Sequence, residues 1–458
     1  MHHPQSATIS LPLGLLAGAL VLSGCWSVDG DLGVFTDGTL NSSGEGATTD
    51  STASTDDPAG STSASSAVTV TGTEAPTSTG DGDGELLCPE GHPKLAPLWT
   101  AQLSVDPDSQ FLENSLVVLS DGRIAVSAGN WDSPDGTTDN GVLWVGQDGI
   151  TQGWDFGPAD RPGYGAIDLR RAPDDSLVAL GFAVQGEEHP MRITQIPADG
   201  SPVTVVDVDV SHIAWPADFE LLGDSMVVIG RGPEEEEPFT MWLARIDLAS
   251  GALEWETLLP SIHPVSGQHV AVGPNGEIVA ARARGAEFKV WRIADDGSVL
   301  WTADLLDQPV MANELMDLVV TPGEQVVAIE QRYYPSKIIA HAIGLAEGEK
   351  RWETLVAFED DSGSPGFGRA LLDPDALLLP LGRGPTPYFK GEFADPLTAS
   401  LVRLSFSGEV LDDTPLPLTD LPSGWRTFSA ARGKCGELLL LHVNGGDPER
   451  YRLWSFAP

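Results

Sequence analysis

The chain has 458 residues, 41% of them hydrophobic, so it is long enough and apolar enough to bury a large core. Its 67 Asp and Glu residues against 25 Lys and Arg residues give a formal net charge of −42, which opposes binding to nucleic acid or to anionic membrane surfaces. We therefore expect no nucleic-acid partner. The charge either attracts cations and basic partners or serves solubility, including in a salty habitat.

The N-terminal segment predicts export. An apolar stretch from Ile9 to Gly24 is too short to span a membrane comfortably. It ends in Leu22-Ser23-Gly24-Cys25, which resembles the lipobox of bacterial lipoproteins, where the cysteine is lipidated and becomes the first mature residue. The resemblance implies a signal peptide over residues 1–24, a lipid on Cys25 and an anchor in the cell envelope. No Lys or Arg precedes the apolar stretch, which departs from the usual signal, so an ordinary cleaved signal or an internal helix is the alternative.

The residue after the cysteine is Trp26 and not Asp, which by resemblance to enterobacterial sorting favours the outer membrane, on its periplasmic side or at the cell surface. Residues 26–85 then contain 22 Ser and Thr, 11 Asp and Glu, and no Lys or Arg. Such a composition cannot bury enough apolar area to offset chain entropy. We expect residues 25–85 to form a disordered tether that holds a folded domain, residues 86–458, away from the membrane.

A repeated pattern predicts the fold of residues 86–458. The turn Asp121-Gly122 is followed by an apolar strand, a loop, a second strand, a Gly turn and Trp154. The same order returns from Asn275-Gly276 to Trp301, and seven such opening turns follow one another at intervals near 50 residues. Each unit is the size of one propeller blade. The sequence predicts an all-β fold, a seven-bladed β-propeller of four-stranded antiparallel blades.

The last unit ends before it can form an outer strand, and the missing strand is expected at the other end of the domain. Residues Leu98–Leu103 closely match Leu300–Leu305, which carry an outer-strand Trp. We therefore expect the N-terminal strand to close the last blade and remove an open sheet edge. Cys88 and Cys435 flank this closure, so we expect them to form a disulfide, whereas the alternative is two unpaired cysteines.

The long connections, between the second and third strands, should all emerge on one face, where binding sites on repeat scaffolds usually occur. The largest contains Tyr388, Phe389 and Phe393, which either form a recognition loop or fold over their own blade. Innermost strands should begin on the same face, and their first residues form a polar ring at the mouth of a central channel. The residues expected there are Tyr164, His269, Glu314, Arg369 and Arg426.

Metal and catalytic motifs are weak. Asp132, Asp135 and Asp139 share one loop and could hold Ca²⁺, but their spacing does not match an EF-hand. We therefore predict no metal site and no cofactor, with calcium as the alternative.

The third unit, Ala244–Trp255, resembles the repeat of the pyrroloquinoline-quinone-like propellers, which run small-x-x-Asp-x-x-x-Gly-x-x-x-Trp. One branch of that family holds quinone- and Ca²⁺-dependent dehydrogenases, which often carry a disulfide of adjacent cysteines. The other holds non-catalytic, BamB-like envelope lipoproteins. This chain has no adjacent cysteines, so the resemblance favours a monomeric lipoprotein that binds a protein or glycan partner. A quinone-dependent dehydrogenase, or another enzyme with its site in the propeller channel, is the alternative.

Overall fold

A computed structural model describes residues 92–103, 110–129, 141–156, 164–183, 191–199, 201–208, 210, 215–232, 240–261, 268–306, 313–333, 336–358, 366–383, 398–418, 427–443 and 452–458. All of them belong to one compact unit, Ser66–Pro458, and the other unit, Met1–Ser65, lies outside the described residues. The expected signal peptide, Cys25, the tether and Cys88 therefore lie outside them too. Within these ranges every regular element is a strand, and no helix long and apolar enough to cross a membrane occurs among them.

The first half of the domain forms three antiparallel sheets of four consecutive strands each. The first contains β2 (Gln110–Val118), β3 (Ile124–Gly129), β4 (Gly141–Val145) and β5 (Thr151–Phe156). The second contains β6 (Tyr164–Arg171), β7 (Leu177–Ala183), β8 (Met191–Ile196) and β9 (Thr204–Val208). The third contains β10 (Trp215–Leu222), β11 (Ser225–Arg231), β12 (Thr240–Asp247) and β13 (Leu253–Pro260).

The second half repeats this order. One eight-stranded sheet contains β14 (Gln268–Val272), β15 (Ile278–Arg284), β16 (Glu287–Ile293) and β17 (Val299–Asp304), followed by β18 (Asn313–Thr321), β19 (Gln325–Tyr333), β20 (Ser336–Gly344) and β21 (Lys350–Phe358). The next contains β22 (Gly366–Phe367), β23 (Leu371–Leu372), β24 (Ala376–Arg383), β25 (Thr398–Ser405) and β26 (Val410–Leu416). The last contains β27 (Thr427–Arg432), β28 (Leu438–Val443), β29 (Arg452–Phe456) and, from the other end of the domain, β1 (Pro97–Gln102).

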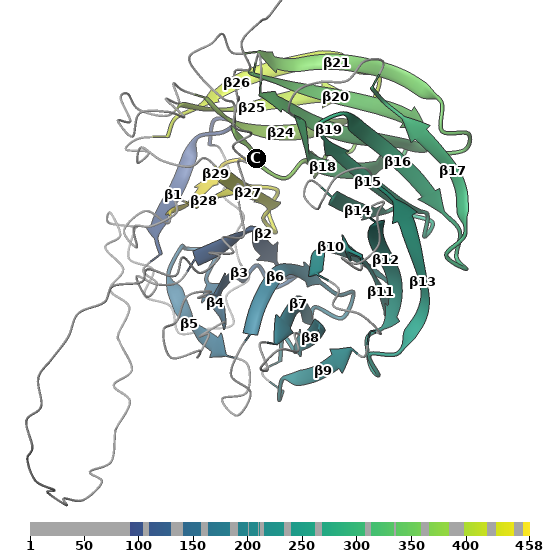
Figure 1. Cartoon of the computed structure of the whole chain (residues 1–458). Helices are drawn as coiled ribbons and strands as arrows, with labels where there is room; N and C mark the ends of the chain where they lie inside the picture. Colours follow the sequence, from purple (N-terminus) through teal and green to yellow (C-terminus); the bar gives the residue numbers. More distant parts are fainter. Residues whose placement is uncertain are drawn as a thin grey trace, which may run out of the picture. The chain divides into compact units, whose positions relative to one another are not determined.

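The sheets stand side by side around a common centre, with β2, β6, β10, β14, β18 and β27 innermost (Figure 1). Seven hydrophobic clusters form the core of the described residues, and each takes side chains from two successive four-stranded units. One of them joins Leu439 and Leu453 of the last sheet to Leu116 and Leu143 of the first. Because each sheet buries both faces against its neighbours, its middle strands are continuous apolar runs, such as the buried residues Val227–Ile229 of β11.

The Gly turns and the outer-strand tryptophans of the sequence pattern meet in the structure. A Cβ atom placed on Gly408 would lie 2.7 Å from the ring of Trp352, which belongs to the preceding unit. Gly297 meets Trp255 in the same way, and Gly149 meets Trp99 of β1. Glycine is required at these turns for two reasons. A Cβ atom would clash with the Trp ring, and the turns have positive φ values, which glycine adopts readily.

The all-β prediction with four-stranded antiparallel sheets is confirmed. β1 pairs antiparallel with β29, from Pro97 opposite Phe456 to Gln102 opposite Arg452.

Candidate functional site

The topology places the long connections and the starts of the innermost strands at the same ends of the sheets, because successive strands run antiparallel. Tyr164 is the first residue of β6, while His269 and Glu314 are the second residues of β14 and β18. Arg369 does not begin a strand as expected, since the innermost strand of its sheet is split and Arg369 lies between β22 and β23. Arg426, Tyr388, Phe389 and Phe393 lie outside the described residues.

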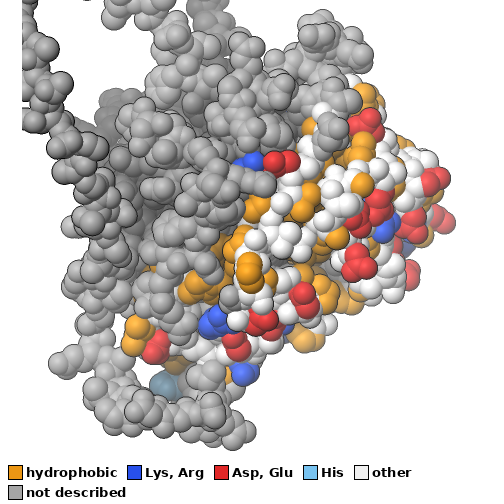
Figure 2. Space-filling view, turned by 90° about the horizontal axis from the view of Figure 1, so that it is seen from below, with side chains coloured by type: hydrophobic (Ala, Val, Ile, Leu, Met, Phe, Trp, Pro, Cys, Tyr) orange, Lys and Arg blue, Asp and Glu red, His pale blue; other side chains and the backbone are white. Residues whose placement is uncertain are grey.

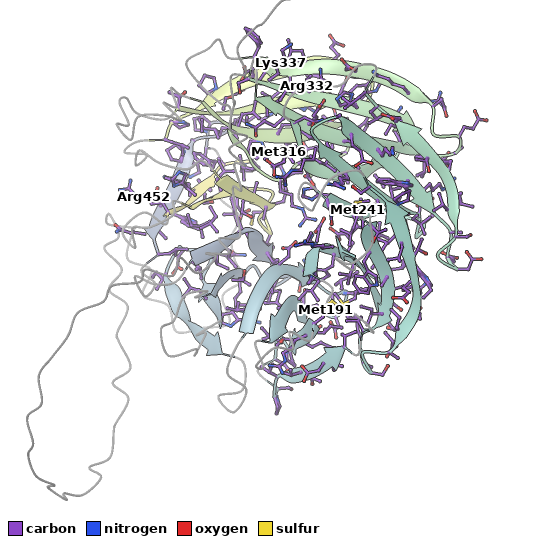
Figure 3. The ribbon with its side chains drawn as sticks, viewed as in Figure 1. Met191, Met241, Met316, Arg332, Lys337 and Arg452 are labelled. Atoms are coloured by element: carbon purple, nitrogen blue, oxygen red, sulfur yellow. The ribbon has the colours of Figure 1, made fainter. Side chains whose placement is uncertain are left out.

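Three innermost strands carry an aspartate directly after a β-bulge. The register shifts before Asp168 in β6, before Asp218 in β10 and before Asp317 in β18. In each case one carboxylate oxygen accepts a hydrogen bond from the N–H of the next residue, at 2.7 Å for Asp168 and at 2.8 Å for Asp218 and Asp317. Met316, labelled in Figure 3, is the extra residue of the third bulge. A bulge re-aims side chains, and here the carboxylates of Asp218 and Asp317 reach the next unit, while that of Asp168 bonds to Arg170 of its own strand.

Two of these aspartates tie successive sheets together. The second oxygen of Asp218 accepts the N–H of Val270 on β14 at 3.1 Å, and that of Asp317 accepts the N–H of Ala370 at 2.6 Å. The residues preceding these two amides are His269 and Arg369. Three aspartates, one histidine and one arginine therefore occupy corresponding places in five successive units.

Arg170 is the hub of the charged groups. Its guanidinium bonds to Asp168, to Oδ1 of Asp218 at 2.9 Å and to Oε1 of Glu220 at 2.9 Å. It also lies over the ring of Phe219, 5.1 Å from its centroid. A buried guanidinium needs such partners, because an unpaired charge in the interior is costly.

The network then crosses the common centre of the sheets. Arg369 donates from Nη2 to Oε1 of Glu220 at 2.6 Å, although the two residues are 149 positions apart and their sheets are not neighbours. His269 Nδ1 lies 3.2 Å from Oδ2 of Asp218. We call the following set the central network: Asp168, Arg170, Asp218, Glu220, His269, Asp317 and Arg369.

Burial and pairing shift the pKa values of the network's aspartates in different directions. Desolvation by burial raises the pKa of Asp168 to about 7, against the attraction of Arg170 and with the repulsion of Asp218 added. Burial acts to raise the pKa of Asp218 as well, but the hydrogen bond with His269 and the charge of Arg170 outweigh it and bring it to about 2. Burial also raises the pKa of Asp317. Near neutral pH, Asp168 is therefore the carboxyl group of the network that exchanges its proton.

A second charged cluster lies within the fifth unit. Glu330 accepts from His341 Nε2 at 2.8 Å and from both Nε and Nη2 of Arg332 at 2.9 Å, and Asn313 also donates to it. His341 is fully buried, and Glu353 lies 3.4 Å from its Nδ1. Arg332 and Lys337, labelled in Figure 3, are register partners at the end of this sheet. This cluster ties the four strands β18 to β21 of one sheet together, and the sequence patterns did not point to it.

The sequence also contains a recurring residue that indicates the central network. Asp168, Asp218 and Asp317 each precede an apolar residue a few positions before a turn of the repeat. A carboxylate recurring at that place, where a buried strand is expected, is unusual enough to mark a shared role.

Two other predicted features are the disulfide and the calcium loop. Cys435 is disulfide-bonded, while Cys25 and Cys88 lie outside the described residues, so the pairing with Cys88 stays a prediction. The loop with Asp132, Asp135 and Asp139 also lies outside them, and among the described residues no cluster of His, Cys, Asp and Glu is arranged to hold a metal ion.

No family model and no curated protein matches the sequence, so membership of the pyrroloquinoline-quinone-like family stays a prediction. Among solved structures, the β-propeller domain of the Trilobed protease from Pyrococcus furiosus is similar at 9% identity, with 76% of this chain and 93% of that chain covered and a TM-score of 0.43. The acylaminoacyl peptidase of Pyrococcus horikoshii is similar at 12% identity, with 77% of this chain covered and a TM-score of 0.45, and this chain spans only 52% of its length. A protein of unknown function from Dyadobacter fermentans DSM 18053 is similar at 12% identity, with 64% of this chain and 95% of that chain covered and a TM-score of 0.42. These likenesses concern the fold alone.

Proposed function

We propose that this chain is a lipid-anchored protein of the bacterial cell envelope, whose seven-bladed β-propeller binds a protein or glycan partner without catalysing a reaction. The lipobox-like end at Cys25 and the acidic Ser/Thr-rich segment support the anchor and the tether. The seven clusters between successive units, and the pairing of β1 with β29, support a closed ring of seven blades. On this count the eight-stranded sheet is two blades, because β15 and β18 are joined by the single pair Arg284–Glu314.

The observation that carries the binding role is the central network itself. Glu220 and Arg369 keep 22% and 29% of their side-chain surface exposed, while Arg170, Asp168 and Asp218 behind them are buried. A rigid scaffold that presents a few oriented polar groups at the strand ends from which long loops leave is typical of a recognition site. The mixed charges suit a polar partner, and the sequence between β24 and β25 contributes the aromatic residues Tyr388, Phe389 and Phe393.

Two experiments test this proposal on the full chain expressed in a bacterial host. Labelling with an alkyne-bearing palmitate should mark the wild-type protein and not Cys25→Ser, and equal labelling would refute the anchor. The lipidated protein should then bind to a defined glycan array or to purified envelope proteins.

Binding should fall when Tyr388, Phe389 and Phe393 are changed together to Ala. The matched control changes Ile150 and Leu411 to Ala, two exposed apolar side chains outside these loops. Equal binding by both variants would contradict the proposed face. An absorbance band from added quinone and Ca²⁺ would instead favour the dehydrogenase.

A further inference from the structure

We propose that the central network receives the guanidinium group of an arginine side chain from a protein partner, at the place where Arg369 now meets Glu220. This rests on the proposed binding function and narrows its partner to a protein with an exposed arginine. Three features of the network support it.

The first feature is the state of Glu220. Arg170 and Arg369 both donate to its Oε1, at 2.9 and 2.6 Å, and no described residue donates to Oε2. A carboxylate can accept two parallel bonds from one guanidinium, which is the strongest geometry for such a pair. Glu220 is half-buried, is held in place by buried Arg170 and has one oxygen to which no described residue donates.

The second feature is the charge balance. Four carboxylates, those of Asp168, Asp218, Glu220 and Asp317, face two guanidiniums and the imidazole of His269. Because burial raises the pKa of Asp168 to about 7, a further cation would be balanced as that carboxyl group ionises, whereas an anion would add to the repulsion. The acidic character of the chain outside the network, with Asp and Glu side chains distributed over the described surface in Figure 2, would steer a basic partner toward the domain.

The third feature is that the charge of Arg369 keeps carboxylate neighbours even if a ligand displaces its guanidinium from Glu220. It is half-buried, it reaches Glu220 from across the ring, and the charges of Asp168, Asp218 and Asp317 also attract it. Because Asp317 bonds to the N–H of Ala370, the residue after Arg369, a carboxylate already lies beside the backbone of the arginine. The guanidinium of Arg369 therefore occupies a site that also fits the guanidinium of an arginine from a protein partner.

The test uses the full chain and a Gly-Arg-Gly peptide with blocked ends, titrated by calorimetry or by ligand-observed NMR. Arg369→Gln removes the internal competitor and should bind the peptide about tenfold more tightly than the wild type. Arg369→Lys keeps the competing charge and should bind no more tightly than the wild type. Glu220→Gln should weaken binding at least about tenfold. Asp412→Asn makes the same charge change at an exposed position on β26 and should have no effect.

Thermal unfolding of each variant shows whether it is folded. Failure of Arg369→Gln to bind the peptide, or equal binding by folded Glu220→Gln and Asp412→Asn, would overturn the inference. Tighter binding of glucosamine than of the arginine peptide would overturn the choice of a guanidinium and point to a glycan. If the arginine peptide binds as expected while changes at Tyr388, Phe389 and Phe393 leave partner binding intact, the network is a recognition site and the loop face is not.

Discussion

Asp168→Asn should flatten much of the pH dependence of stability between about pH 5 and about pH 8. The side chain is buried, and desolvation raises its pKa from 3.8 to about 7. In that interval the folded protein holds a proton that the unfolded chain has already lost. The free energy of unfolding therefore falls as pH rises from about 4 to about 7 and is level above that, as far as this group is concerned.

The size of the effect follows from the same two values. A pKa difference of about three corresponds to about 4 kcal/mol in total, of which about 3 kcal/mol lies between pH 5 and pH 8. Asparagine is neutral at every pH and can still accept the bond that Leu169 donates, so the variant should lose this slope. Asp317 and His341, whose pKa values are also raised, contribute a slope of the same sign in both proteins.

The assay is urea-induced unfolding at four pH values across this interval, for the wild type, for Asp168→Asn and for a control. Asp174→Asn is the control, because Asp174 lies in an exposed turn where hydrogen bonds from Ser176 lower its pKa, so it titrates below the interval. The reasoning is refuted if the wild type becomes more stable toward pH 8, or if Asp168→Asn and Asp174→Asn keep the wild-type slope.

Three further predictions concern the fold. Gly408→Ala should lower the free energy of unfolding by more than about 1 kcal/mol, because its φ is 86° and a Cβ would lie 2.7 Å from Trp352. Gly323→Ala, with no atom closer than 3.8 Å, is its control, and equal losses would refute the docking argument. His341→Gln should cost about 3 kcal/mol below pH 6. It should cost less as pH rises above the raised pKa of His341, since the charged imidazole then deprotonates in the wild type too; a loss independent of pH would contradict this. Cys435→Ser should destabilise the domain by about 2–5 kcal/mol, as dithiothreitol should do to the wild type, and a variant as stable as the untreated protein would count against a structural disulfide.

The sheets could be predicted from the sequence because their signals are local. A Gly turn with positive φ, an apolar run and a Trp at a fixed distance occur within one unit, and Gly297 and Trp301 show how closely residue type follows geometry there. Two positions departed from the pattern. In the second unit Val206, and not a Trp, lies against Gly251, while Leu411 in the sixth unit is exposed.

The central network could be predicted only in part. The sequence predicts His269 and Arg369 at the starts of innermost strands. The structure places His269 near the start of β14 and Arg369 between β22 and β23, and both belong to the network. Arg170 and Glu220 were not identified, because their roles depend on partners in other sheets. An ion pair between residues 149 positions apart produces no periodic pattern in the sequence around either residue. A bulge before Asp218 also changes the alternation of inward and outward side chains, so a strict period of two misplaces it.

The central claim is that a charged network joins two sheets that are not neighbours through Glu220 and Arg369. A double-mutant cycle on unfolding free energy, with Glu220→Gln, Arg369→Gln and the double variant, measures that link directly. Both side chains are about one quarter exposed and the bond is 2.6 Å long, so the account predicts a favourable coupling energy of about 1–2 kcal/mol, reduced by salt. Additive effects of the two substitutions, with no coupling at low salt, would contradict it.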